Sequence, residues 1–141
     1  MELVELADCQ MTYRTLELLD YGAGGQIYGT LDGSVTGPRL TADLEVTNLA
    51  ARRPDNVNMP ALRGLLRTKD GAAIWVELDG ISVLRPEDGA RAFITSVRFR
   101  TGDERYAWVN TITALLEAVL DTAAVGGHVH ARLYECRHTL A

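Results

Sequence analysis

The chain has 141 residues, of which 47% are hydrophobic and 23% are charged, a size and composition that predict one globular domain with its own hydrophobic core. The formal net charge is −5 and no run of basic residues occurs, which argues against a nucleic-acid partner. No apolar run reaches about 18 residues, and the acidic N-terminus lacks a basic segment followed by an apolar one, so we expect no membrane partner and a cytoplasmic location.

Turn signals divide the chain into short segments. Gly-Gly, Asp-Gly or Thr-Gly-Asp sequences stand at residues 24–25, 32–33, 70–71, 88–89, 101–103 and 126–127, between apolar or alternating runs. Asp-Gly and Gly-Gly between such runs are strong hairpin signals. The spacing predicts an antiparallel meander of strands closed into a barrel or a sandwich.

Alternation of apolar and polar residues locates the expected strands. They are expected at residues 11–19, 35–47, 61–68, 72–80, 92–101 and 128–137, and a loop is expected at 52–56. Within 35–47, Leu40, Ala42 and Leu44 alternate with polar residues, and this period of two gives one apolar face and one wet face. Residues 69–71 join two of the strands as a hairpin.

Residues 111–121 leave two structures open. Ile112, Leu115, Leu116 and Val119 follow the spacing of an amphipathic helix, and Ala and Leu favour helix. The alternative is a strand that places Ile112, Leu116 and other alternate residues on one face. The sequence pattern alone favours the helix.

Several motifs in this order resemble one family. They are Gly37-Pro-Arg-Leu40, Arg53-Pro-Asp55, Leu66-Arg-Thr-Lys-Asp-Gly-Ala72, Thr101-Gly-Asp103, Arg105-Tyr-Ala-Trp-Val-Asn110 and Leu133-Tyr-Glu135. With them the chain resembles family 3237 of domains of unknown function, over most of its length. One departure is Asn56, which stands where glycine often follows Pro-Asp in that family.

The resemblance implies an all-β fold. The expected structure is an antiparallel closed β-barrel, lipocalin-like and with short loops, in one domain that covers residues 1–141. It also implies a pocket that opens at one end, and it makes residues 111–121 a strand paired with 128–137 across 122–127. The family supplies no settled catalytic residues.

Polar and aromatic residues on the expected strands form the candidate site. The candidate substrate-binding residues are Arg63, Trp75, Arg98, Trp108, Asn110 and Tyr134, and the candidate catalytic residues are Glu77, Tyr106 and Asp103. Every second residue of a small barrel points inward, where an unsatisfied polar group costs about 1–3 kcal/mol. Glu77 would then be a general base whose pKa is raised by desolvation, and Arg63 or Arg98 would hold an oxyanion. Tyr106 or Tyr134 would supply a proton.

The strand that carries Trp75 has a second interpretation. If Ile74, Val76 and Leu78 fill the core, Trp75 and Glu77 lie outside, in a subunit interface. Alternation shows which residues share a face but not which face is inside, so both interpretations stay open.

Three other candidates also have structural interpretations. Asp103 follows a glycine, and a turn or cap role is favoured over acid catalysis. Asn110 is interpreted as an anchor for a neighbouring strand, whereas Trp108 is interpreted as part of the site.

No motif for a cofactor or a nucleophile is present. The chain lacks a P-loop, a GxGxxG after a strand, an HExxH and a GxSxG sequence. His128 and His130 permit joint metal ligation with Cys136 or His138, but exposed strand histidines are the commoner case, so we expect neither metal nor cofactor.

These observations favour a small-molecule-binding barrel. The leading hypothesis is a cofactor-independent acid/base enzyme, an isomerase, cyclase or lyase acting on a small organic substrate. The alternatives are a non-catalytic binding or carrier module and a structural oligomer. A homo-oligomer is expected in each case.

Overall fold

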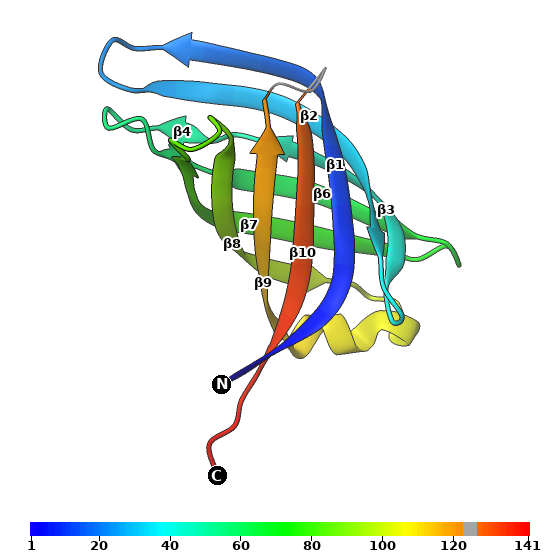
Figure 1. The fold of residues 1–141 in the computed structure, drawn as a ribbon. Coiled ribbons are helices and arrows are strands. Elements are labelled where there is room, and N and C mark those ends of the chain that lie inside the picture. Colours follow the sequence, from blue (N-terminus) through cyan, green and yellow to red (C-terminus); the bar gives the residue numbers. More distant parts are fainter. Residues whose placement is uncertain (123–126) are drawn as a thin grey trace.

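The computed structural model describes residues 1–122 and 127–141, and in them eight long antiparallel strands close into a barrel (Figure 1). The strands are β1 (Glu2–Asp20), β2 (Gly25–Thr36), β3 (Thr41–Asn48), β6 (Ala61–Thr68), β7 (Ala73–Leu84), β8 (Arg91–Arg100), β9 (Thr113–Asp121) and β10 (His128–Arg137), with the short β4 (Ala51–Arg52) and β5 (Asn58–Met59) between β3 and β6. Each long strand pairs with the next long strand along the chain, and β1 pairs with both β2 and β10, which closes the sheet. The closed antiparallel β-barrel expected from the resemblance is confirmed.

The conflict over residues 111–121 is decided in favour of a strand. β9 pairs with β8 on one side and β10 on the other, and Ala114, Leu116 and Ala118 point into the core. Hydrogen bonding on both edges outweighs the helical preference of Ala and Leu. Of the connection expected at 122–127, residues 123–126 lie outside the described residues.

One strand prediction and two turn predictions were wrong. Residues 37–40 form a turn, so the strand expected over 35–47 is divided between β2 and β3. Residues 32–33 lie inside β2, because Gly33 is a close approach: a Cβ there would lie 1.9 Å from the Gln10 carbonyl oxygen of β1. Residues 101–103 lead into η1 (Glu104–Thr111), a 3-10 helix, instead of a hairpin. The turn expected at 126–127 falls partly outside the described residues.

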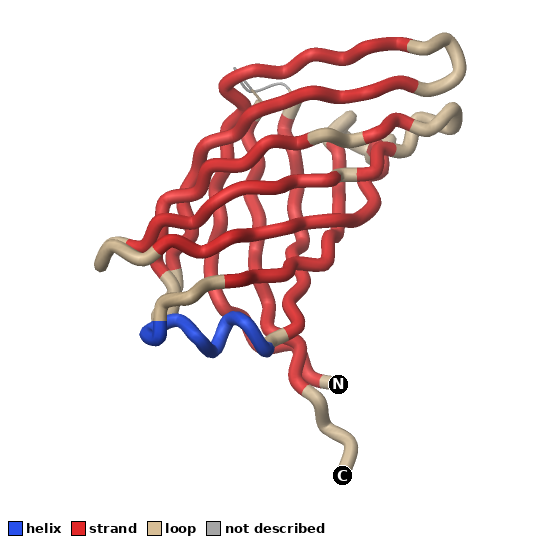
Figure 2. The backbone as a smooth tube through the Cα atoms, turned by 180° about the vertical axis from the view of Figure 1, so that it is seen from behind, coloured by secondary structure: helices blue, strands red, loops and turns tan. Residues whose placement is uncertain are grey.

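Aliphatic side chains fill the barrel, and η1 closes one end. The fully buried side chains include Met11, Leu31, Leu66, Ile74, Val97 and Val129. η1 lies across the end near both termini (Figure 2) and contributes Val109, which is buried. Among the described residues, this half of the barrel is therefore packed core.

The opposite end is open and carries a projecting ribbon. Among the described residues, the β1–β10 ladder ends at Thr12 opposite His128, the Tyr13 N–H still donates to the Gly127 carbonyl (3.2 Å), and beyond that point β1 pairs with β2 (Figures 1 and 2). A β-bulge between Tyr13 and Thr15 shifts the alternation by one residue. Leu16 and Leu18 therefore continue the face on which Tyr13 lies, and they overhang the mouth of the barrel.

The packed half predicts a large cost for a cavity. Leu66→Ala should lower the free energy of unfolding by about 2–5 kcal/mol, because Leu66 is fully buried in the core. Leu3→Ala, at an exposed position of β1, should change it by less than about 0.5 kcal/mol. Urea denaturation measures both, and equal losses would contradict this description of the core.

Candidate functional site

A chamber of about 210 Å³ lies at the open end, below the typical ~300–1,000 Å³ of drug-sized ligand sites. Its apolar wall includes Leu16, Leu18, Ile27, Phe93 and Leu120, and its polar groups are Tyr13, Asn48, Arg52, Asn58, Ser82, Arg91 and Thr122. No Asp or Glu is among the described residues that line it. The chamber suits a small, largely apolar molecule with a few polar atoms.

Tyr13 is held as a hydrogen-bond donor facing this chamber. The backbone N–H of Ala61 donates to Asn48 Oδ1 (3.2 Å), which fixes the amide, and Asn48 Nδ2 donates to the Tyr13 oxygen (3.0 Å). The Tyr13 proton is thus left for another acceptor. Burial raises the pKa of Tyr13, and the bond from Asn48 offsets part of that rise. The phenol is therefore kept in its protonated form.

A glycine makes room for the Tyr13 ring. A Cβ at Gly29, on β2, would lie 2.6 Å from Cε1 of that ring. Any larger residue would displace the ring or the strand, so the neighbouring strand sets the position of the phenol.

Two arginines define the polar side of the chamber. Arg91 is only 7% exposed, and its Nη atoms donate to backbone carbonyls of Asn56 (3.0 Å) and Ser82 (3.4 Å). Arg52 donates from Nε to Asn58 Oδ1 (2.8 Å). Asn58 and Ser82 are opposite each other in the β5–β7 pairing, so the two arginines are anchored to adjacent positions.

The loop that holds Arg91 depends on Asn56. This residue has φ of 68°, in the left-handed region that asparagine tolerates better than most residues do. Its side-chain oxygen lies 3.4 Å from Arg91 Nη2 and adds an acceptor that glycine would lack. The departure from the family pattern therefore keeps the turn and adds a contact.

Neither arginine of the chamber has an acidic partner among the described residues. The ion pairs found there involve other arginines and His130. Burial, and then the charge of Arg52, lower the pKa of Arg91. Two like charges at a buried edge are unfavourable, so the geometry of this edge suits a negatively charged group.

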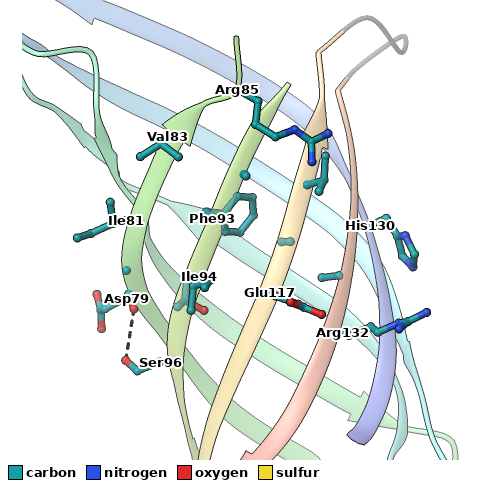
Figure 3. A pocket seen from close by; sticks show the side chains of 16 residues that line it. Asp79, Ile81, Val83, Arg85, Phe93, Ile94, Ser96, Glu117, His130 and Arg132 are labelled. Atoms are coloured by element: carbon teal, nitrogen blue, oxygen red, sulfur yellow. Dashed lines mark hydrogen bonds between the residues drawn. The ribbon is translucent and has the colours of Figure 1, made fainter. Parts of the chain in front are cut away.

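A wider groove of about 890 Å³ runs along the outside of β7 to β10 (Figure 3). Its apolar residues include Ile81, Val83 and Ile94, all exposed. Two of its charged groups already have partners, because Asp79 accepts from Arg63 and Glu117 accepts from Tyr134. The groove is open to solvent, so it encloses a small molecule less well than the chamber does.

The strand face that carries Trp75 points outward, so of the two interpretations left open for this strand, the one that places Trp75 and Glu77 in the lumen is wrong. Trp75 is 37% exposed, while Ile74, Val76 and Leu78 fill the core. On the outer face Glu77 pairs with Arg63 (3.3 Å) and Arg100 (3.6 Å). Apolar side chains face the interior because burying a charged carboxylate would cost far more free energy than burying an apolar group.

Arg98 and Tyr134 also lie on the outer face. Arg98 is exposed opposite Glu77 in the β7–β8 register. The hydroxyl of Tyr134 donates to Glu117 on β9 (2.8 Å). Neither side chain is among those that line the chamber at the open end.

Four further candidates lie at the closed end, around η1: Asp103, Tyr106, Trp108 and Asn110. Asp103 accepts from the Arg105 backbone N–H (3.0 Å) at the helix N-terminus, and the Tyr106 hydroxyl donates to Asp70 (2.9 Å). Asn110 bonds both ways with the Thr101 backbone. They stabilise the plug and do not meet the chamber.

Trp108 belongs to the same end of the barrel. It packs against the core, and the Arg39 guanidinium lies 3.9 Å from its ring centroid. This cation–π contact uses the ring face that a ligand would otherwise occupy. The structure therefore separates the nine candidates into an outer set and a closed-end set.

The histidines of β10 have other partners. His128 bonds with Gln10 (2.7 Å) and His130 with Asp8 (3.0 Å). In residues 1–122 and 127–141, no group of three His, Cys, Asp or Glu side chains is placed to hold a metal ion. Within the same residues, no helix has the length and apolarity needed to cross a membrane.

The sequence analysis missed Tyr13, Asn48, Arg52 and Arg91. Arg91 begins the inward alternation that continues through Phe93, and that pattern was the only signal that could have found it. Tyr13 and Asn48 are brought together by strand pairing alone, since 35 residues separate them.

The fold and the site define a closed antiparallel β-barrel with one plugged end and a donor-lined chamber at the other. Residues 9–135 match the family described as "Protein of unknown function (DUF3237)", and the chain belongs to that family. The resemblance seen in the motifs is thereby confirmed. Among curated proteins, no match to the chain is found.

Solved structures with the same fold come from several organisms. A β-barrel like protein from Acinetobacter baumannii has 19% identity and a TM-score of 0.83, with 96% of each chain covered. A conserved protein of unknown function from Rhodopseudomonas palustris has 18% identity and a TM-score of 0.81, with 95% of this chain and 96% of that one covered. A structure described as an enzyme from Penicillium herquei has 23% identity and a TM-score of 0.70, covering 94% and 93%. At these identities the likeness shows the fold.

The closed end predicts a dependence of stability on acid. Hydrogen bonds from Thr68 and Tyr106, with the charge of Arg105, lower the pKa of Asp70. Its contribution to stability is therefore present above about pH 4, the ordinary Asp pKa, and is lost as the pH falls through the lower folded value. Asp70→Asn should flatten the fall of the melting temperature below about pH 4.

Thermal unfolding followed by circular dichroism at several pH values measures this effect. Asp43→Asn removes one carboxylate from the exposed face of β3 and controls for the change in net charge. An unchanged acid profile in Asp70→Asn would show that this carboxylate does not stabilise the plug.

Proposed function

We propose that the barrel binds a small organic molecule in the chamber at its open end and acts on it by cofactor-independent acid/base chemistry. The observation that carries this proposal is the composition of the chamber, an apolar wall opposite hydrogen-bond donors with no carboxylate among its described residues. Such a site complements a molecule whose oxygen atoms accept hydrogen bonds. Isomerase, cyclase and lyase reactions that proceed through an enolate develop negative charge on an oxygen.

Tyr13 is the proposed proton donor. Its raised pKa keeps the proton on the phenol near neutral pH, which suits an acid or an oxyanion donor better than a base. The Asn48 side-chain amide donates to the phenol oxygen of Tyr13, so the Tyr13 O–H is free to donate to a substrate oxygen.

The fold comparison gives independent support for catalysis. The Penicillium herquei protein of similar fold is described as an enzyme, so this barrel architecture accommodates catalysis. Glu77, which the sequence suggested as the base, is engaged in two ion pairs outside the barrel, so we do not place it in the reaction.

Proton exchange tests the proposal without knowledge of the natural substrate. A site that stabilises an enolate oxygen should speed the exchange of protons beside the carbonyl of a small ketone in D₂O, with solvent taking and returning the hydrogen. We expect exchange of cyclohexanone or acetophenone above the buffer rate, followed by ¹H NMR. Tyr13→Phe should lower the excess rate by about 10²-fold, the low end for acid/base catalysis.

Tyr28→Phe is the matched control, since Tyr28 is exposed on β2. It should retain the wild-type exchange rate. Exchange no faster than buffer for the whole ketone panel, or equal rates in Tyr13→Phe and Tyr28→Phe, would count against acid/base catalysis by Tyr13. Binding of a ketone without exchange would favour the carrier alternative.

A homo-oligomer is the second part of the proposal. Ile81, Val83 and Ile94 form an exposed apolar patch on β7 and β8 (Figure 3), and such patches commonly mark interfaces. Light scattering after size exclusion should give a mass above that of one chain for the wild type. Ile94→Arg should shift it to the monomer, while Leu3→Arg should not. A monomeric wild type would refute the oligomer.

A further inference from the structure

We propose that the ligand of this chamber is an organic acid whose carboxylate binds between Arg52 and Arg91 and whose apolar body lies against Phe93 and Leu18. This inference rests on the proposed function, because it assigns a substrate class to the same chamber. It follows from three separate observations about charge, hydrogen bonding and exposed apolar surface.

The first observation is a pair of positive charges with no counter-charge. Arg91 is buried and Arg52 is half-buried, and neither forms an ion pair with a described residue. The four remaining residues, 123–126, are Ala, Ala, Val and Gly, which have no carboxylate side chain. An arginine does not release its proton in a protein, so an anion bound in the chamber would relieve the repulsion between the two guanidinium groups.

The second observation is the set of donors left over. Arg52 uses Nε for Asn58, and its Nη atoms have no partner among the described residues. Arg91 uses its Nη atoms for backbone carbonyls, and its Nε has none there. Asn58 accepts through Oδ1, which leaves its amide N–H groups to donate. A planar carboxylate with two oxygens matches such a group of donors.

The third observation is the apolar overhang. Leu16 and Leu18 line the chamber but remain 54% and 48% exposed, because the ribbon that carries them extends beyond the barrel. Phe93 and Leu120 form the wall below them. A ligand with an apolar ring would cover this surface while its acid group reaches the arginines. An inorganic anion would leave that surface exposed.

Benzoate and benzamide are the probes, since they share a ring and size but differ in charge. In ¹H–¹⁵N spectra of the wild type, benzoate should shift the amide signals of chamber residues such as Tyr13 and Phe93. Its affinity should exceed that of benzamide at least tenfold. Acetate, an anion without a ring, should bind at least tenfold more weakly than benzoate.

Variants separate the arginine pair from general charge effects. Arg52→Gln should lower benzoate affinity at least tenfold and leave benzamide affinity unchanged. Arg98→Gln, on the exposed outer face, is the matched control and should leave both unchanged. Arg91→Lys keeps the positive charge but loses the planar set of donors, so it should also weaken the binding of benzoate. The dispersion of the spectra shows that each variant is folded.

Three outcomes would overturn the proposal that the ligand is an organic acid. The first is equal affinity of the wild type for benzamide and benzoate. The second is an equal loss of benzoate affinity in Arg98→Gln and Arg52→Gln. The third is that benzoate shifts only the amide signals of residues on the outer face. Benzamide binding in the chamber, or ketone exchange that depends on Tyr13, would then leave the proposed function standing. Absence of both binding and exchange would remove both proposals together.

Discussion

The pairing of β1 with both β2 and β10 is the contact on which the rest of the structure depends. Along Glu2–Thr12 and His128–Arg137, the first and last strands satisfy each other's backbone hydrogen bonds, so neither strand leaves a free edge there. Closure also fixes which face of every strand points inward, because a slip of one residue would exchange the core for the surface. Ile74 and Glu77, on opposite faces of β7, show the result.

The chamber exists because this pairing stops before β1 does. The described β1–β10 ladder ends at Thr12, with one further bond from the Tyr13 N–H to Gly127, and the bulge between Tyr13 and Thr15 places the next leucines over the mouth. One irregularity therefore positions the phenol, opens the barrel and supplies the apolar overhang. The polar side comes from β4, β5 and the start of β8, which meet at the same end.

Sequence reasoning reached the fold and missed the site, for identifiable reasons. Alternation located residues 61–68 and 128–137 with the observed bounds, and the family motifs indicated closure. Alternation alone could not choose the inner face of β7, so Trp75 was left undecided. It also could not reveal a bulge, which breaks the period that defines a strand. Tyr13 and Arg91 lie on strands distant in sequence, and only the closed sheet brings them to one chamber.

Helix η1 closes one end of the barrel, and the chamber opens at the other end. Val109 and its neighbours fill the opposite end, so whatever occupies the chamber must arrive and depart through the same mouth. Because the chamber holds one small molecule, a second molecule cannot enter before the first has left. In kinetic terms, a product that lingers would compete directly with the next substrate. The rate of departure past Leu16 and Leu18 would set an upper limit on turnover.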